Sequence, residues 1–157
     1  MARLSHLGDA PVVIGICVLL IIMPQARKTV ALPVYATVIL ASMIYITLKT
    51  IFSPEPQSLF QLLSGTNYGF PSGHAINNSS LYAMLLIQTF VYLKKLPLKI
   101  LLALLYMSLT MLSGISRIVV GIHRSGDVLG GWLIGFIVAF LVFLIMCAIH
   151  YRRNSTR

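Results

Sequence analysis

Charged residues are scarce in this sequence, at 10% of 157 residues, whereas hydrophobic residues reach 58%. Ordinary soluble proteins are about half apolar and about a quarter charged. A soluble domain of this length has a large surface for its volume, and that surface must be mostly polar. The composition therefore excludes an ordinary soluble domain. It predicts one integral membrane domain, formed by residues 1–157, with lipid as its solvent.

Cysteine is also sparse. Cys17 and Cys147 are the only two; both lie in apolar segments, and neither has a metal-ligand spacing to the other or to a histidine. Free cysteines of this kind are ordinarily small buried hydrophobes. We therefore expect them to be structural, and we predict no metal site and no cofactor.

Acidic residues are few: three Asp and Glu stand against twelve Lys and Arg, which gives a formal net charge of +9. Such an excess can indicate a nucleic-acid partner. The basic residues form short clusters between apolar segments, at Arg27 and Lys28, at Lys94, Lys95 and Lys99, and at Arg152, Arg153 and Arg157. Clusters of this kind are loop charges that set membrane orientation. The predicted partner is therefore the lipid bilayer and not a nucleic acid.

Five apolar segments bounded by charge, Pro or Gly predict the transmembrane helices. They are residues 8–25, 30–48, 74–93, 97–116 and 127–151. A helix needs about 20 residues to cross the hydrocarbon core, so we expect an all-α bundle of about five membrane helices. The first segment is the weakest of the five. A cleaved signal peptide is disfavoured there because the basic residues follow the apolar run.

The basic clusters also indicate the orientation of these helices. If the clusters are cytoplasmic, the N-terminus lies outside, the C-terminus is cytoplasmic, and loops 49–73 and 116–127 share the outer face. Pro and Gly interrupt the first loop, and residues 59–63 within it are expected to form a short interfacial helix. The compact chain with basic cytoplasmic loops favours a bacterial inner (cytoplasmic) membrane.

Most of the remaining ionisable groups lie in or beside the two outer loops. They are Lys49, Glu55, His74, Arg117, His123, Arg124 and Asp127. Ionisable groups at membrane depth are functional candidates, because burying them in lipid without a purpose is costly.

Two stretches beside these loops carry the chemistry. Residues 70–74 read Phe-Pro-Ser-Gly-His, and residues 116–127 begin with Ser-Arg and end with His-Arg-Ser-Gly-Asp. The planar guanidinium of Arg117 suits phosphate oxygens. Ser72 and Gly73 offer a hydroxyl and backbone N–H groups where a helix begins, and helix starts attract anions. Together they predict an anion-binding site.

His123 and Asp127 are four residues apart across a helix start. At that spacing the carboxylate can accept a hydrogen bond from one ring nitrogen and leave the other free to attack phosphorus, as in the orienting arrangement of a catalytic triad. His74, from the other stretch, can protonate the leaving oxygen as a general acid. No step in this scheme requires a metal ion.

The two stretches resemble the signature of the type 2 phosphatidic acid phosphatase and vanadium haloperoxidase superfamily. The Pro-Ser-Gly-His motif matches residues 71–74, and the Ser-Arg, His and Asp spacing matches residues 116–127. The resemblance extends over about residues 7–149. It implies a helical bundle and a phosphohistidine intermediate. Members often have six spans, which would place a sixth before residue 1.

The resemblance also implies a role for each matching residue. His123 is the implied nucleophile, Asp127 its orienting partner and His74 the acid. The implied phosphate-binding residues are Lys49, Ser72, Gly73 and Arg117.

A third motif of the family, Lys followed after several residues by Arg-Pro, is only partly present. Lys49 and Pro56 fit, but Glu55 stands where the family has arginine. A carboxylate there would repel phosphate by about 1 to 4 kcal/mol at about 4 Å. Either Glu55 turns away, or the substrate carries a cation or amine, or Arg124 supplies the missing charge. We favour Arg124 as a further phosphate-binding residue.

The implied activity is that of a lipid phosphate or lipid diphosphate phosphatase, which works at the outer face and releases inorganic phosphate. A lipid phosphotransferase with the same site is an open alternative, and a non-catalytic lipid-binding protein is less favoured. The haloperoxidase branch is disfavoured because it is largely soluble. Undecaprenyl diphosphate, phosphatidylglycerol phosphate, phosphatidic acid and lipid A all present a phosphate at a membrane surface, so the substrate lipid stays open. The oligomeric state is open too.

Two further patterns concern helix packing. Small residues recur at the start of the fifth segment, at Gly126, Gly130, Gly131 and Gly135. Their spacing favours close helix approach in lipid. Polar residues open the third segment, at Asn77, Asn78, Ser79 and Ser80. We expect these to form interhelical hydrogen bonds near the site without a catalytic role.

Overall fold

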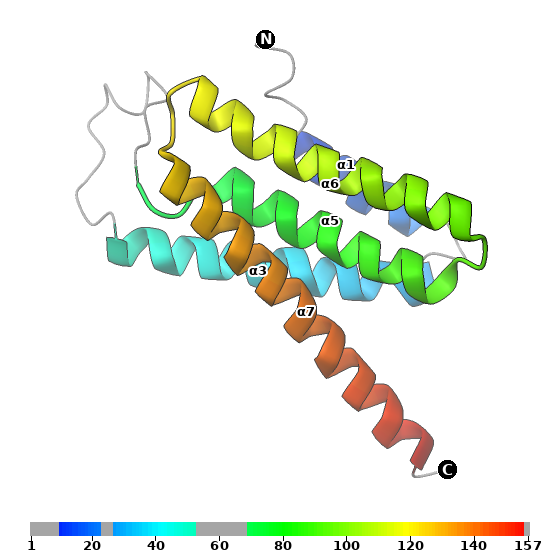
Figure 1. Cartoon of the computed structure of the whole chain (residues 1–157). Helices are drawn as coiled ribbons and strands as arrows, with labels where there is room; N and C mark the ends of the chain where they lie inside the picture. Colours follow the sequence, from blue (N-terminus) through cyan, green and yellow to red (C-terminus); the bar gives the residue numbers. More distant parts are fainter. Residues whose placement is uncertain (1–9, 23–26, 53–68, 156–157) are drawn as a thin grey trace.

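The computed structural model describes residues 10–22, 27–52 and 69–155, which are helical apart from short connections (Figure 1). The elements in order are α1 (Ala10–Ile22), the π-helical η2 (Arg27–Ala31), α3 (Leu32–Phe52), α5 (Gly73–Tyr92), α6 (Leu96–Val119) and α7 (Ser125–Ser155). The predicted all-α fold is confirmed. The expected interfacial helix at residues 59–63 lies outside the described residues.

Within these described ranges, three helical stretches are long and apolar enough to cross a membrane. They are Thr29–Phe52, Leu96–Val119 and Ser125–Arg152. This is fewer than the five predicted spans, for two reasons. Helix α1 has 13 residues, whereas crossing takes about 20. Helix α5 has 20 residues, but its Asn and Ser residues lower its hydropathy.

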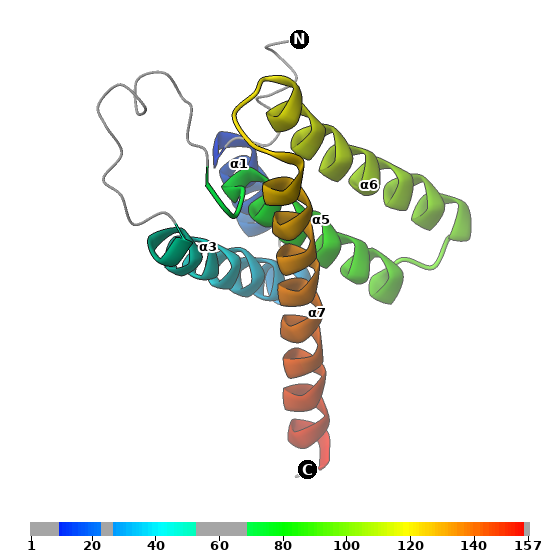
Figure 2. The same cartoon turned by 60° about the vertical axis from the view of Figure 1, so that its left-hand side comes forward.

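Helix α5 can carry polar residues because it is the central helix of the bundle. It contacts α3, α6 and α7, and Figure 2 shows it between α3 and α6 with α7 crossing the group. Its Ile76, Leu81 and Met84 are fully buried. The outer helices instead expose large apolar side chains, such as Leu101 and Leu133 at 62% each. Those outer faces suit contact with lipid acyl chains, whereas α5 contacts protein on most sides.

Glycines bring α7 against α5. A Cβ added to Gly131 would lie 2.7 Å from Cβ of Ala75 and 3.0 Å from the carbonyl oxygen of Ser72. A Cβ on Gly135 would overlap the hydroxyl of Ser79. Because only glycine leaves room for this approach, the predicted close helix packing is confirmed for Gly131 and Gly135. It is not confirmed for Gly126, where nothing lies within 4 Å of an added Cβ.

The arrangement gathers four helix ends at one end of the bundle. Figure 1 shows the end of α3, the start of α5, the end of α6 and the start of α7 together, while the last turns of α7 extend away from the other helices. The motifs singled out in the sequence lie at this shared end.

Candidate active site

The two sequence motifs are joined by a backbone hydrogen bond. The N–H of Ser72 donates to the carbonyl of Asp127 at 3.1 Å, and the carbonyl of Ser72 accepts from the N–H of Ile76 at 3.0 Å as α5 begins. Ser72 is the N-cap residue of α5, with extended backbone angles. The start of α5 is therefore attached directly to the first turn of α7.

The turn between α6 and α7 brings His123 back onto Arg117. The backbone N–H groups of Ile122 and His123 donate to the carbonyl of Arg117 at 3.1 and 3.3 Å. This reversal passes through Gly121, whose φ of +76° is rarely adopted by other residues. His123 and Arg117 are each only 9% exposed. The imidazole and the guanidinium therefore occupy one buried neighbourhood.

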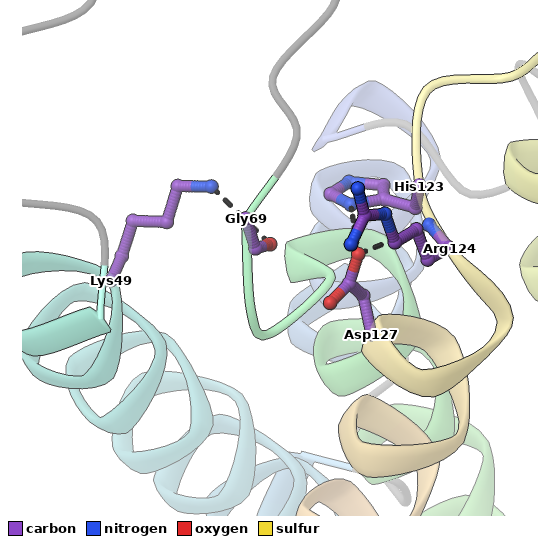
Figure 3. Close-up of polar contacts among 5 residues, drawn as sticks. All are labelled: Lys49, Gly69, His123, Arg124 and Asp127. Carbon is purple, nitrogen blue, oxygen red and sulfur yellow. Dashed lines mark hydrogen bonds and ion pairs between the residues drawn. The ribbon is translucent and has the colours of Figure 1, made fainter.

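Asp127 is held in place by the backbone at the start of α7. Its Oδ2 accepts a hydrogen bond from the backbone N–H of Arg124 at 3.0 Å and lies 3.8 Å from Nδ1 of His123 (Figure 3). That second distance is within ion-pair range but too long for a hydrogen bond. The carboxylate faces Nδ1, which leaves Nε2 of the ring for chemistry.

Burial, together with nearby positive charges, lowers the pKa of His123. Burial lowers the pKa of His123 below the usual histidine value, and the positive charges of Lys49, His74 and Arg117 lower it further. The carboxylate of Asp127 raises the pKa and only partly offsets these effects. A neutral imidazole keeps a free electron pair, as a nucleophile must.

Helix α3 contributes Lys49 from its last turn. The ammonium of Lys49 donates to the carbonyl of Gly69 at 3.4 Å, as Figure 3 shows. Four residues earlier on α3, the ring of Tyr45 lies against Gly73, where an added Cβ would come within 2.9 Å of Cζ. The end of α3 is thus attached to the segment that leads into α5. The Tyr45 contact was not predictable from the sequence, because it depends on how two helices cross.

Ser72 carries a buried hydroxyl that has no hydrogen-bond partner in the described part of the chain. The residue is fully buried, and an unpartnered buried hydroxyl is unfavourable. A phosphate oxygen would satisfy it. Among the described residues, no three His, Cys, Asp or Glu side chains come together as metal ligands would.

Of the third motif, Lys49 belongs to the described residues. Glu55 and Pro56 lie outside the described residues. The side chain of Arg124 is exposed, and it is the backbone of Arg124 that holds Asp127. The role of the Arg124 guanidinium therefore stays a prediction.

A cavity of about 740 Å³ lies at the opposite end of the bundle. It is lined by residues of η2, α3, α5 and α7, among them Thr29, Leu32, Gln88, Phe143 and His150. None of the predicted site residues lines it. The candidate site is therefore taken as Lys49, Ser72, Gly73, His74, Arg117, His123 and Asp127.

Comparison with known proteins connects this site to a family. Phosphatidylglycerophosphatase B of Bacillus subtilis (strain 168) is 33% identical over 85 residues, which cover 52% of this chain and 40% of that protein. The chain thus matches less than half the length of this curated relative.

Two crystal structures have a similar fold. The first transmembrane PAP2 type phosphatidylglycerolphosphate phosphatase from Bacillus subtilis superposes with a TM-score of 0.69 at 22% identity, covering 95% of this chain and 76% of that one. Aquifex aeolicus LpxE superposes with a TM-score of 0.64 at 28% identity, covering 90% and 82%.

The family model decides the assignment. The model of the PAP2 superfamily matches residues 31–151, which include every residue of the candidate site. The resemblance predicted from two short motifs is confirmed, and the chain belongs to the PAP2 superfamily.

Proposed function

We propose that this protein is a phosphatase of lipid phosphates or lipid diphosphates that acts through a phosphohistidine on His123. The observation that carries the proposal is the environment of His123: a buried imidazole with the Asp127 carboxylate 3.8 Å from Nδ1. The positive charges of Lys49, His74 and Arg117 act on the same ring. Membership of the PAP2 superfamily supports this chemistry.

In the first step, the phosphate of the lipid binds among the cationic groups and the start of α5. The guanidinium of Arg117 and the ammonium of Lys49 neutralise its oxygens, while the hydroxyl of Ser72 and backbone N–H groups at Gly73 donate to it. The electron pair on Nε2 of His123 forms a bond to phosphorus as the bond from phosphorus to the leaving oxygen breaks.

The proton needed by the leaving oxygen comes from His74 as general acid. The positive charge that develops on the imidazole of His123 is stabilised by Asp127, which already faces Nδ1. This electrostatic stabilisation is available without rearrangement, because the backbone N–H of Arg124 holds the carboxylate in place.

In the second step, water attacks the phosphorus of the phosphohistidine. His74, now neutral, accepts a proton from that water; the bond between phosphorus and Nε2 breaks, and its electron pair returns to the ring. Inorganic phosphate leaves. A lipid hydroxyl or phosphate in place of water would make the protein a phosphotransferase, and both outcomes use the same residues.

The proposed location follows from charge. The basic clusters are assigned to the cytoplasm, so the site faces the outside of a bacterial inner membrane and the lipid tail stays in the outer leaflet. The name of the Bacillus subtilis relative points to phosphatidylglycerophosphate. We therefore place this lipid first in a substrate panel that also holds phosphatidic acid, undecaprenyl diphosphate and lipid A.

The test is phosphate release from this panel by purified protein in detergent. We expect release from at least one lipid and a loss on the order of 10³-fold or more in kcat for His123→Ala. His150→Ala is the matched control, because His150 is exposed and lies near the other end of α7. Protein that binds the lipids without releasing phosphate, with His123→Ala behaving like wild type, would instead favour a lipid-binding role.

Arg124→Ala tests the proposed replacement for the family arginine. The variant keeps the backbone N–H that holds Asp127, so any loss reports on the guanidinium alone. We expect KM for the lipid phosphate to rise about three- to tenfold, as for a lost exposed charge contact with phosphate. Unchanged kinetics would refute this role.

A further inference from the structure

A buried hydrogen bond joins α5 to α6 in the interior of the bundle. The side-chain amide of Asn78 donates through Nδ2 to Oγ of Ser113. Asn78 is fully buried and Ser113 is 3% exposed. Within the described residues, the second polar atom of the amide, Oδ1, has no hydrogen-bond partner. Both side chains are shielded from the protein surface, so the geometry of the pair depends on how the two helices pack.

The position of this pair in the sequence is informative. Asn78 follows His74 by four residues on α5, and Ser113 precedes Arg117 by four residues on α6. Four residues are about one helical turn, or roughly 6 Å along the axis. The hydrogen bond therefore lies one turn beneath the proposed acid and one turn beneath the proposed phosphate-binding arginine.

The backbone hydrogen bonds described above account for only part of the arrangement of the site. The backbone carbonyl of Arg117 already accepts from the N–H of His123, so the nucleophile and the guanidinium are held together at the end of α6. His74 belongs to α5. The alignment of the acid with the other two groups therefore depends on how α5 is attached to α7, through the Ser72–Asp127 bond, and on the register between α5 and α6, where the Asn78–Ser113 hydrogen bond is a direct connection.

A polar pair in an apolar interior is well suited to setting such a register. Apolar contacts tolerate small sliding of one helix along another, whereas a buried amide keeps its partner only in one alignment. The large side chains on the outer faces of the bundle impose no comparable constraint, because they face lipid.

We infer that Asn78 and Ser113 are positioning residues that align His74 with the leaving oxygen of a phosphate bound at Arg117. The inference rests on the proposed function. Neither residue touches the phosphate; both act through His74. Removing either side chain is expected to lower the rate of the step that needs the proton from His74.

The first experiment compares Asn78→Ala, Ser113→Ala and the double variant with wild type. With a lipid phosphate as substrate we expect each single variant to lower kcat about tenfold, which is the size of rate loss that a small misplacement of reacting groups causes. KM should change less than about threefold. The double variant should be no slower than the slower single variant, because both changes remove one interaction. Ser113→Ala introduces a good helix former, so it keeps the test valid if Asn78→Ala fails to fold.

The second experiment uses the leaving group. A p-nitrophenolate leaves without a proton, whereas a lipid alkoxide requires one. Misalignment of His74 in the Asn78→Ala or Ser113→Ala variant should therefore slow the hydrolysis of p-nitrophenyl phosphate less than about threefold. In a His74→Ala background, Asn78→Ala should cause no further loss on the lipid substrate. A purely structural defect would slow both substrates equally and add to the His74→Ala defect.

Two variants serve as controls. Thr110→Val removes a buried hydroxyl of α6 that bonds only to the carbonyl of Tyr106 within its own helix, and kcat should stay within about twofold of wild type. Ser113→Thr keeps the hydroxyl and should retain most of the rate.

The outcomes separate the two proposals. If the Asn78 and Ser113 variants keep wild-type kcat while His123→Ala is inactive, the positioning inference is wrong and the proposed function stands. If His123→Ala is fully active, the proposed function itself fails. Equal losses on both substrates, with a matching fall in thermal stability, would also overturn the positioning role.

Discussion

His123 loses most of its solvent contact, and this decides its protonation state. A buried imidazole surrounded by Lys49, His74 and Arg117 resists taking up a proton, so its pKa is lowered. The protonated form cannot attack phosphorus. Activity should therefore rise as pH increases through the pKa of His123, and the acid limb of the pH profile for kcat/KM should lie below about pH 6.5, the ordinary histidine value.

The same burial has a consequence for stability. The pKa of His123 is about 6.5 in the unfolded chain and lower in the folded chain. As the pH drops below about 6.5, the unfolded chain takes up the proton first. The contribution of His123 to the stability of the folded state therefore falls. The loss continues until the pH passes the lowered pKa of the folded state. This window lies on the acid side of neutrality.

Removal of the positive charge of Lys49 provides a test at the residue scale. Since Lys49 lowers the pKa of His123, Lys49→Met should raise that pKa and move the acid limb of kcat/KM to higher pH. KM should rise as well, because a phosphate contact is lost. The measurement is a full pH profile of kcat/KM on the lipid substrate.

Lys99→Met is the matched control for this charge change. Its ammonium contacts the carbonyl of Phe90 at 3.0 Å, at the far end of α5. The acid limb should not move in this variant. A limb that is unchanged in Lys49→Met would show that Lys49 does not act on His123, the proposed nucleophile.

At the scale of elements, contact between α5 and α7 holds both motifs together. The attachment has two parts: the hydrogen bond from Ser72 to Asp127 and the glycine surface that faces Ala75. Ser42 adds a third helix, because its hydroxyl donates to Oδ1 of Asn77 at 3.3 Å. The interhelical hydrogen bonds predicted for the start of α5 are thus confirmed for Asn77, Asn78 and Ser79, whose hydroxyl donates to the carbonyl of Gly131 at 3.4 Å. Ser80 instead donates to the carbonyl of Asn77 within its own helix.

Gly131→Ala tests the helix contact. The new Cβ would clash with Cβ of Ala75 and with the carbonyl oxygen of Ser72. Neither atom can move aside, because the first belongs to a short side chain and the second to the backbone. Overpacking of this kind costs about 1 to 3 kcal/mol. We expect a lower midpoint of thermal unfolding in detergent and a loss of activity, because the start of α7 is pushed away from Ser72.

Gly126→Ala separates the packing effect from the change of residue type. Nothing lies within 4 Å of a Cβ at that position, so stability and activity should match wild type. Equal behaviour of the Gly126→Ala and Gly131→Ala variants would contradict the role assigned to close approach.

At the scale of the whole molecule, the proposed orientation places the candidate site and the basic clusters on opposite sides of the membrane. Single cysteines introduced into a Cys17→Ala, Cys147→Ala background can test it. Ser125 begins α7 beside the site, and Lys94 lies in the connection between α5 and α6; both are exposed.

We expect a membrane-impermeant maleimide applied to intact cells to label Ser125→Cys and to spare Lys94→Cys. Disruption of the membrane should then expose Lys94→Cys to the reagent. The reverse labelling pattern would place the site in the cytoplasm and exclude the proposed orientation.

Local features of the chain were predictable from sequence. The preference for lipid follows from composition alone, because too few charged residues exist to form a polar exterior. The pairing of His123 with Asp127 follows from a four-residue spacing at a helix start, and the structure brings these two side chains to 3.8 Å. Five membrane spans were expected from apolar length; among the described residues three stretches meet the length and hydropathy of a span, and α5 does not, because the Asn and Ser residues that its neighbours in the bundle cover lower its hydropathy.

Contacts between distant residues required the tertiary structure. The hydrogen bond from Ser72 to Asp127, the position of Lys49 beside Gly69 and the bond between Asn78 and Ser113 each join residues that lie far apart in the sequence. Spacing along a chain specifies neighbours within one helix, since a helical turn has a constant length. Which residues meet across helices depends on crossing angle and register. These follow from side-chain packing over the whole bundle and are absent from any single motif.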